Sequence, residues 1–482
     1  MNIMVIVRLV LLVWILLLSI VEGFAQTTEQ ATRIAEPLEV GFSRKNITPP
    51  VGMRLCGTFE EKLSTGVHDS LYVRALVFQQ GTTKLAIAGC DLAMVSPQVG
   101  DAVRNKVAAL GFLKENVLIH ASETHNGPDY FGEFREVFHH RAINEHGYDP
   151  AEPIDYAEYL ATQISQAIRD ADRLRHPSAL RYGEGKAEGI AFYRRYRMKD
   201  GSIGWNPGKL NPDIVAPTGP VDPRVPVLSV HHPSTDTLTA LLTGFAMHLA
   251  TLEDLLYSAD YPYYLSQQLA KSLSPNVFTH FLQAPCNEVN HLDVTTDEPQ
   301  MGYEWAEVVG KTLANSVREV LRQPTETLFP DLRVAATTVE LALQEFPPEE
   351  IKKQREIWYY ADRSELPFLE VVHSAKVTGI AERHRGEPVS ALIQAFQLSP
   401  ETVLIGLPSE VSVELGLAIR EKSPYAHTIV VQLSNDWLGY IPTRRIFEEG
   451  NYEAVVAKVQ PGEGERLVDL TLELVKTLKV SD

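Results

Sequence analysis

The stretch Leu85-Ala-Ile-Ala-Gly-Cys-Asp91 is an apolar run that stops at a charged side chain, and it sets the pattern for the rest of the chain. It lies within residues 84–95, which follow another apolar run of strand length at residues 71–79. Residues 98–110 then have the apolar spacing of a helix, and residues 116–121 are strand-like again. Strands that alternate with helices predict an α/β protein built from mixed layers of sheet and helix.

The alternation continues towards the end of the chain. Further strands are expected at residues 238–247, 276–283, 333–343, 391–396, 402–406 and 428–433, and further helices at residues 155–173, 264–273, 304–322 and 464–478. Residues 201–226 are rich in Gly and Pro and predict a long ordered loop, whereas residues 323–330 are expected to be a simple connection. The pattern indicates one large domain over residues 36–482.

The N-terminus has the layout of a secretory signal peptide at residues 1–25. Arg8 precedes an apolar core at residues 9–20, and small residues at Gly23 and Ala25 stand before the expected cleavage point. An uncleaved anchor is the alternative, but the apolar core is short for a membrane span. No later stretch reaches spanning length. The mature protein is therefore expected to be soluble, and secreted or periplasmic.

Composition excludes several classes of function. The chain of 482 residues has 44 Lys and Arg against 62 Asp and Glu, a formal net charge of −18. A protein that neutralises nucleic-acid phosphates or docks on anionic lipid needs a basic excess, so neither partner is expected. The three cysteines allow one disulfide at most, and none of them has an evident activating partner. A thiol nucleophile is therefore not expected, and an acidic globular enzyme remains.

Polar clusters break the apolar pattern directly after predicted strands. They lie at residues 120–128, 244–248, 283–293, 406–410 and 435–443. Ligand sites gather at strand ends in layered α/β proteins, and Glu123 and His125 point to the same side if their segment is extended. Imidazole and carboxylate groups are zinc ligands. Each cluster also has a structural interpretation: His248 as a hydrogen-bonded core residue, Glu410 as a helix cap, and Tyr440 as a packed side chain.

Taken in order, the clusters resemble the neutral, non-lysosomal ceramidase family, specifically its catalytic domain. The resemblance rests on Val40-Gly-Phe-Ser-Arg-Lys-Asn-Ile-Thr-Pro-Pro50, Gly66-Val-His-Asp-Ser-Leu-Tyr-Val-Arg-Ala-Leu76, Gly89-Cys-Asp-Leu-Ala-Met-Val95, Thr124-His-Asn-Gly-Pro128, Ser258-Ala-Asp-Tyr-Pro262, Leu407-Pro-Ser-Glu410, Leu438-Gly-Tyr-Ile-Pro-Thr443 and Tyr452-Glu-Ala454. The family's C-terminal immunoglobulin-like domain is not expected in this chain. The resemblance implies a zinc amidase that cleaves the N-acyl bond of ceramide, a sphingolipid.

The resemblance also implies roles for individual residues. His248 matches a zinc-binding histidine of the family, Glu410 its glutamate ligand and Tyr440 its tyrosine. Tyr452 matches a tyrosine that lines the active site. Arg194 falls near the position of an arginine that contacts the substrate.

The sequence departs from the family at two positions. The family's first cluster normally reads Thr-His-Thr-His-Ser-Gly-Pro, and its first histidine binds zinc; this chain has Glu123 there, while His125 matches the second histidine, which is usually assigned to catalysis. A carboxylate can still bind zinc, although a harder ligand set also suits other metals. Asn290 stands where the family has a serine proposed as nucleophile, and an amide cannot take that role.

These residues predict a metal-dependent amide hydrolase with one zinc ion held by Glu123, His248, Glu410 and Tyr440. The nucleophile is expected to be a water molecule activated by the metal. His125 or Glu288 would transfer protons, and Tyr452 or Arg194 would stabilise the oxyanion. The substrate would be a lipid-like or other small amide. Two alternatives remain open: a hydrolase of a carbohydrate or other polar amide or ester, and a catalytically silent binding protein on the same scaffold.

Overall fold

The fold is built from sheets that turn one face each towards a common apolar interior. The computed structural model describes residues 36–479, of which residues 38–479 belong to one compact unit. The three larger sheets have the strand orders β5-β4-β3-β1-β6, β15-β13-β12-β7-β17 and β18-β19-β20-β22. This architecture confirms the predicted mixed α/β class. The predicted signal peptide, residues 1–25, lies outside the described residues.

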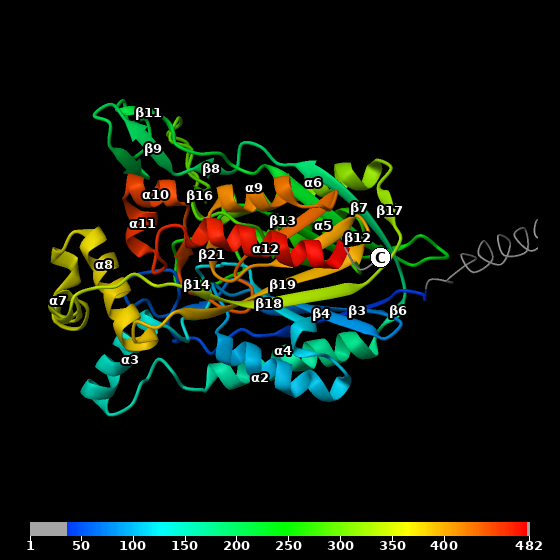
Figure 1. Cartoon of the computed structure of the whole chain (residues 1–482), viewed down its shortest axis with the longest axis horizontal. Helices are drawn as coiled ribbons and strands as arrows, with labels where there is room; N and C mark the ends of the chain where they lie inside the picture. The colour runs from blue at the N-terminus through cyan, green and yellow to red at the C-terminus, as the bar shows by residue number, and fades with distance from the viewer. Residues whose placement is uncertain (1–35, 480–482) are drawn as a thin grey trace, which may run out of the picture. The chain divides into compact units, whose positions relative to one another are not determined.

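The first sheet carries the opening sequence motif. Its strands are β1 (Glu39–Asn46), β3 (Tyr72–Gln80), β4 (Thr83–Cys90), β5 (Val117–Ala121) and β6 (His176–Pro177). Neighbouring strands are antiparallel except β4 and β5, which are parallel. Its outer face is covered by α2 (Pro97–Val107) and α4 (Tyr156–Arg173), which lie side by side in Figure 1. Helix α4 begins where the Asp155 side chain accepts a hydrogen bond from the Glu158 amide, a typical N-cap.

The second sheet leads into the polar cluster at residues 244–248, which contains His248. It consists of β7 (Ala179–Lys186), β12 (Arg224–His231), β13 (Leu238–Phe245), β15 (Phe278–Gln283) and β17 (Glu326–Leu328), with β13 and β15 parallel. Helices α5 (Tyr261–Ser272) and α6 (Tyr303–Arg322) pack on its outer side. They approach closely at Gly310, where a Cβ atom would lie 2.6 Å from the Cβ of Tyr264. Only glycine fits there without moving a helix.

The third sheet comes from the C-terminal part of the chain. It consists of β18 (Arg333–Leu341), β19 (Val389–Ser399), β20 (Thr402–Gly406) and β22 (His427–Val431), with β20 and β22 parallel. Helices α9 (Val413–Lys422) and α12 (Glu463–Lys479) cover it, as Figure 1 shows for α12 in red over β18 and β19. Between β18 and β19 the chain inserts α7 (Pro348–Tyr360), the short turn Arg363–Glu365, α8 (Phe368–Gly379) and a π-helical turn (Ile380–His384).

The common interior is an apolar core to which all three sheets contribute. Its fully buried members include Phe78 and Ile87 from the first sheet, Leu228 from the second, and Phe396 and Leu404 from the third. Each sheet also buries its other face against its own helices. Strands buried on both faces need near-continuous apolar sequence, which is why residues 85–90 and 402–406 lack the polar alternation of a surface strand.

Shorter elements complete the fold. They are 3-10 turns at Ala108–Leu110 and Lys114–Asn116, strands β2 (Gly66–Val67), β8 (Phe192–Tyr193), β9 (Arg195–Met198), β10 (Ile203–Trp205), β11 (Ile214–Pro217), β14 (Leu256–Tyr257), β16 (Val289–Asn290), β21 (Glu410–Val411) and β23 (Tyr440–Ile441), and helices α3 (Glu133–His146), α10 (Arg444–Glu449) and α11 (Tyr452–Val456).

Two segments differ from the sequence prediction. Residues 201–226, expected to be a loop, contain β10 and β11, which pair with β9 in a small sheet. Residues 323–330, expected to be a connection, contain the edge strand β17. Both segments form their strands through pairing partners elsewhere in the chain, and Gly and Pro in their sequences hide that pairing from local patterns.

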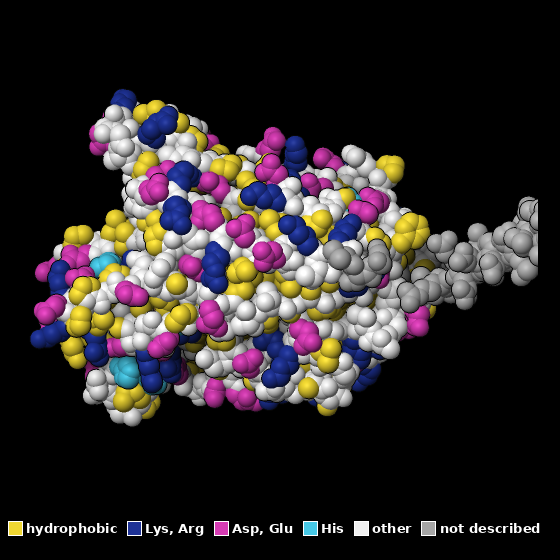
Figure 2. All heavy atoms as spheres, in the orientation of Figure 1, with side chains coloured by type: hydrophobic (Ala, Val, Ile, Leu, Met, Phe, Trp, Pro, Cys, Tyr) yellow, Lys and Arg dark blue, Asp and Glu magenta, His cyan; other side chains and the backbone are white. Residues whose placement is uncertain are grey.

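The surface and the cysteines are consistent with ordinary globular packing. Figure 2 shows acidic and basic side chains interspersed over the viewed face. Within residues 36–479, no helix is long and apolar enough to cross a membrane. Cys56, Cys90 and Cys286 are buried free thiols.

Candidate active site

Four predicted metal ligands come together where strands of the three sheets end. Glu123 follows β5 of the first sheet, and His248 follows β13 of the second. Glu410 and Tyr440 follow β20 and β22 of the third sheet, where they are direct register partners in the parallel pair β21 and β23. The carboxyl ends of these strands therefore deliver all four side chains to one place.

Three of the side chains surround a ring nitrogen of the fourth, His248. The Nε2 atom of His248 lies 3.0 Å from the hydroxyl oxygen of Tyr440, 3.4 Å from a carboxylate oxygen of Glu123 and 3.7 Å from one of Glu410. All four residues are buried. The arrangement therefore offers one imidazole nitrogen with three oxygen atoms around it, close enough together to bind a single metal ion.

A backbone hydrogen bond orients the imidazole of His248 so that its Nε2 atom could bind a metal ion. Its Nδ1 atom lies 3.1 Å from the carbonyl oxygen of Val289, and a carbonyl can only accept a hydrogen bond. The proton is therefore on Nδ1, and Nε2 presents its lone pair to the Tyr440 hydroxyl and the two carboxylates. Metal-binding histidines are commonly held by such a bond from the second ring nitrogen.

The two carboxylates are suited to a cation. Burial and the nearby Glu410 raise the pKa of Glu123 well above its usual value, and burial also raises the pKa of Glu410. The Glu123 oxygen that faces His248 has no hydrogen-bond partner among the described residues, although it is fully buried. A buried acceptor without a donor is costly, and a metal ion at this point would satisfy it and offset the repulsion between the two carboxylates.

The backbone at these two glutamates is strained. Glu123 has a φ of 79°, and Ser409, directly before Glu410, has a φ of 63°. Residues other than glycine rarely adopt this left-handed region, which costs of order 1–3 kcal/mol. Strain of this kind persists where surrounding structure imposes it, and it clusters at functional sites.

Cys286 contacts Glu123 and His248 on the side opposite to the Nε2 atom of His248. Its thiol donates to the second Glu123 oxygen at 3.3 Å and lies 3.7 Å from Nδ1 of His248, on the side of the ring away from Tyr440. Glu123, His248 and Cys286 together could also bracket a metal ion. Because burial and Glu123 raise the pKa of the thiol, and because Nδ1 carries a proton, the Nε2 side is the better ligand set.

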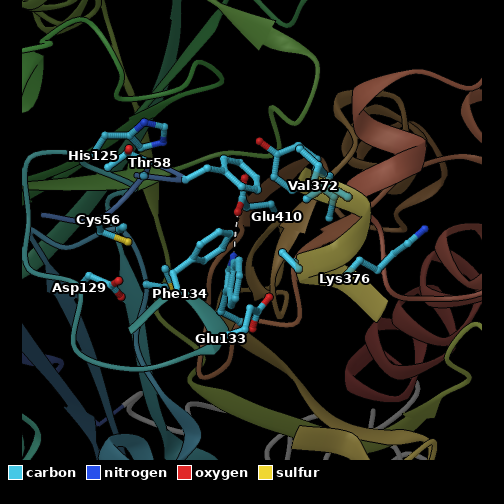
Figure 3. A pocket seen from close by; sticks show the side chains of 18 of the residues that line it. Cys56, Thr58, His125, Asp129, Glu133, Phe134, Val372, Lys376 and Glu410 are labelled. Carbon is cyan, nitrogen blue, oxygen red and sulfur yellow. Dashed lines mark hydrogen bonds between the residues drawn. The ribbon is translucent and has the colours of Figure 1, made fainter. Parts of the chain in front are cut away.

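A pocket opens on the cluster and contains two of the predicted catalytic side chains. Its lining includes Glu123, Glu410 and Tyr440 together with His125 and Tyr452. Figure 3 shows Glu410 and His125 on the pocket wall, with the hydrogen bond of 2.8 Å that Glu410 accepts from the Trp437 indole. The rings of His125 and His248 are 6.2 Å apart, and burial and Arg194 lower the pKa of His125 to about 4.

Arg194 lies beside the pocket with its charge directed at the cluster. Its guanidinium donates to the Tyr440 hydroxyl at 3.2 Å and to Glu453 at 2.9 Å. It also stands over the ring of Tyr452, 5.5 Å from the ring centroid. Tyr452 is stacked on Trp205 at 4.5 Å, which fixes its ring plane. Arg194 and Tyr452 thus lie next to the predicted metal ligands, where a guanidinium and a phenol are groups that can stabilise an oxyanion.

The chain resembles known proteins in its fold. No protein-family model and no curated protein sequence matches the chain. Among solved structures, neutral ceramidase from Pseudomonas aeruginosa aligns with a TM-score of 0.71 and 19% identity over 92% of this chain and 75% of that chain. The chain has the neutral ceramidase fold. A structure described as ceramidase complexed with C2 gives the same TM-score, identity and coverage.

In this ceramidase fold, the side chains of Glu288 and Asn290 form their hydrogen bonds away from the four predicted metal ligands. The Glu288 carboxylate accepts from the Val413 amide at 3.1 Å and the Ser412 hydroxyl at 3.2 Å, which places it at the start of α9. None of its side-chain hydrogen bonds within residues 36–479 reaches the predicted metal ligands. Asn290, at the position of the family's serine, donates to Asn206 at 2.9 Å. Proton transfer by Glu288 therefore stays a prediction, and the geometry favours His125.

Sequence reasoning missed the residues that hold the ligands in place. Gln283 donates to Glu123 at 2.7 Å, Trp437 orients Glu410, and Glu453 anchors Arg194. Gln283 and Trp437 lie in the polar clusters that follow strands, and Glu453 lies in the motif Tyr452-Glu-Ala454, so these patterns pointed to the right segments. Their individual roles depend on contacts between distant parts of the chain.

Proposed function

We propose that the chain is a secreted, metal-dependent hydrolase that cleaves an N-acyl amide bond. The observation that supports this most strongly is the convergence of Glu123, Glu410 and Tyr440 on Nε2 of His248. The neutral ceramidase fold supports the same reaction class, and the proposed signal peptide at residues 1–25 supports secretion.

The residues present fit one zinc ion. Glu123, His248, Glu410 and Tyr440 would hold it, and the unpartnered Glu123 oxygen marks where it would lie. Zinc, when bound, supplies Lewis acidity towards a substrate carbonyl and lowers the pKa of a nucleophilic water. Cys286 and Gln283 would hold the other Glu123 oxygen, so that the carboxylate keeps one orientation.

The chain's own side chains supply the remaining chemistry. His125 is neutral at pH 7, because burial and Arg194 hold its pKa near 4, so its ring can accept a proton from the attacking water. The same ring can return that proton to the leaving amine. Arg194 and Tyr452 face the metal ligands from one side, where a guanidinium and a phenol would stabilise negative charge on the former carbonyl oxygen.

A lipid-like amide such as ceramide is the first substrate candidate, because the pocket has apolar and aromatic walls. These walls include Phe59, Met94, Phe134, Val372 and Trp437. A polar amide, such as an N-acyl amino sugar, is the second candidate. It is favoured by charged side chains in the same lining, namely Asp129, Glu133 and Lys458.

Metal analysis of the purified protein, combined with incubation against a short-chain ceramide and an N-acyl amino sugar, tests the proposal. His248→Ala and Glu410→Ala are expected to abolish both metal content and turnover. The matched surface variants His146→Ala and Glu145→Gln, whose side chains are 45% and 67% exposed, should retain both. Full metal occupancy in His248→Ala would overturn the ligand assignment. A parent protein without metal or turnover would favour the silent binding protein.

A further inference from the structure

The pocket contains one acidic side chain for which the structure shows no partner. Asp129 lines the wall next to Cys56, and the residue is only 6% exposed. Figure 3 shows its carboxylate directed into the pocket on the side of Phe134. Within the described residues this carboxylate takes part in no hydrogen bond or ion pair. Buried carboxylates are rarely left in this state, because desolvation without compensation is costly.

The cations near Asp129 are engaged elsewhere. Arg54 forms a two-pronged contact with Asp149, at 2.7 and 3.0 Å. Arg135, the other cation that acts on Asp129, donates to Glu152 at 2.6 Å. Elsewhere in the pocket lining, Lys458 lies 2.6 Å from the acidic Glu133. Glu133 is therefore neutralised by the protein, whereas Asp129 is not. Nothing in the described fold accounts for an acid at position 129 through a structural contact.

The backbone holds Asp129 in this position. Its amide donates to the carbonyl of Arg54 at 2.9 Å, and the Cys56 amide donates to the carbonyl of Gly127 at 2.9 Å. An isolated bridge between Leu55 and Pro128 lies between these two bonds. The carboxylate thus projects from a segment that is tied to its neighbour on both sides, and it cannot easily turn away from the pocket.

We propose that Asp129 is a specificity residue that binds a hydroxyl group of the substrate, at a distance from the amide bond that is cleaved. The inference rests on the proposed function. An N-acyl substrate carries no ammonium group before cleavage, so a hydroxyl is the donor it can present away from the reacting amide. The aromatic faces of Phe134 and Trp437 in the same lining would pack against the carbon skeleton that bears the hydroxyl.

The protonation state agrees with this ligand. Burial raises the pKa of Asp129 to about 8, so the carboxyl group is largely protonated at pH 7. A protonated carboxyl both donates and accepts, and a hydroxyl does the same, so the two groups can form a reciprocal pair. Two classes of N-acyl compound carry such a hydroxyl: long-chain amino alcohols, as in ceramide, and amino sugars.

Matched substrates separate hydroxyl recognition from general effects. We would assay three metal-loaded proteins on two pairs of substrates: the parent, Asp129→Leu and the control Asp213→Asn. The Asp213 side chain is 66% exposed. One pair is N-hexanoylglucosamine and N-hexanoylcyclohexylamine; the other is a short-chain ceramide and the N-acyl alkylamine of equal length. Asp129→Leu is expected to lower kcat/KM for the hydroxylated member about tenfold, the loss typical of one hydrogen bond, and to leave the other member within about twofold. The pair that shows the loss identifies the substrate class.

An equal effect of Asp129→Leu on both members of a pair would overturn the inference. Thermal unfolding gives a second readout: removal of a buried, unpartnered carboxyl should leave the melting temperature unchanged or raise it, and a lower melting temperature would indicate a structural role instead.

Failure of the proposed function gives a different result. If the metal-loaded parent hydrolyses none of the four compounds, calorimetric titration with N-hexanoylglucosamine and with the short-chain ceramide still tests Asp129. Binding of either compound that is about tenfold weaker in Asp129→Leu supports the inference. Equal binding by parent and variant, or no binding of either compound, overturns it.

Discussion

Glu123 and His248 face each other at 3.4 Å, between a carboxylate oxygen without a hydrogen bond and a ring nitrogen whose opposite side donates to a backbone carbonyl. The ring nitrogen presents its lone pair, with the Tyr440 hydroxyl 3.0 Å away, and burial together with Glu410 raises the pKa of Glu123 well above its usual value. Glu410 adds a second carboxylate at 3.7 Å from the same nitrogen. Under the proposed function, a cation bound between these groups would offset the cost of burying two neighbouring carboxyl groups.

Glu123→Gln tests this balance by removing one charge while keeping the shape of the side chain. Without metal, the variant should be at least as stable as the parent, because burial and Glu410 already disfavour a charged group at position 123. With zinc, it should bind the metal more weakly by about 100-fold or more, since Glu123 is a proposed ligand and loss of a residue that only orients a ligand already costs about 10–100-fold. Melting temperatures with and without a chelator measure both effects. A variant that is less stable than the parent under both conditions would contradict the interpretation.

Trp437→Phe tests whether the orientation of Glu410 matters. The indole donates to one Glu410 oxygen at 2.8 Å, and phenylalanine keeps an aromatic ring without that donor. We expect metal affinity to fall by about tenfold or more, as for other residues that orient a ligand. Zinc titration against a competing chelator provides the measurement. Trp358→Phe, a fully buried tryptophan in a separate apolar cluster, is the matched control and should bind zinc as the parent does.

Glu453→Ala tests the buried charge cluster behind the site. Glu453 is fully buried and lies 2.9 Å from Arg194 and 2.6 Å from Arg195. Its removal leaves buried guanidinium groups short of a partner, and we expect a loss of about 3–5 kcal/mol in the free energy of unfolding. Denaturant titration measures this loss.

The control for Glu453→Ala is Glu449→Ala. Glu449 also contacts Arg195, at 3.0 Å, but its side chain is 19% exposed and leaves Arg195 paired with Glu453. The control should therefore cost clearly less. Equal losses in the two variants would show that burial of Glu453 does not govern its contribution.

The pair His120 and His280 predicts loss of stability in acid. Their Nε2 atoms lie 2.8 Å apart in the core between the first two sheets, so at least one ring must be neutral. Burial lowers the pKa of His120 from 6.5 to about 4, and burial together with His120 lowers the pKa of His280 well below its usual value. A lowered pKa means that the unfolded chain binds protons first.

The contribution of the pair is therefore complete above about pH 6.5 and falls as the pH decreases towards 4. Each histidine can add up to about 1.4 kcal/mol per pH unit to the slope. The double variant His120→Leu/His280→Leu should flatten the dependence of unfolding free energy on pH across this window. An unchanged slope would show that other groups, such as the buried His291, account for it.

Much of the fold followed from local patterns in the sequence. The fully buried strand β20 and the first three residues of β5 are apolar runs, and α4 has a clear apolar face after its Asp155 cap. Both properties are local, so they are readable in the chain itself. The pairing of β10 and β11 with β9 was not readable, because those short strands form only when a partner is supplied by the tertiary fold.

The polar clusters and the resemblance to ceramidases also located the segments of the candidate site, down to Glu123, His248, Glu410 and Tyr440. What they could not supply is the contacts, because these join residues far apart in the chain: His248 and Tyr440 are 192 positions apart, and Gln283 and Glu123 are 160 apart. Only the packing of three sheets around one core brings such groups together. The same packing assigns Glu288 to the start of α9 and leaves Asp129 without a partner in the pocket, because the positions of neighbouring charges depend on the whole fold.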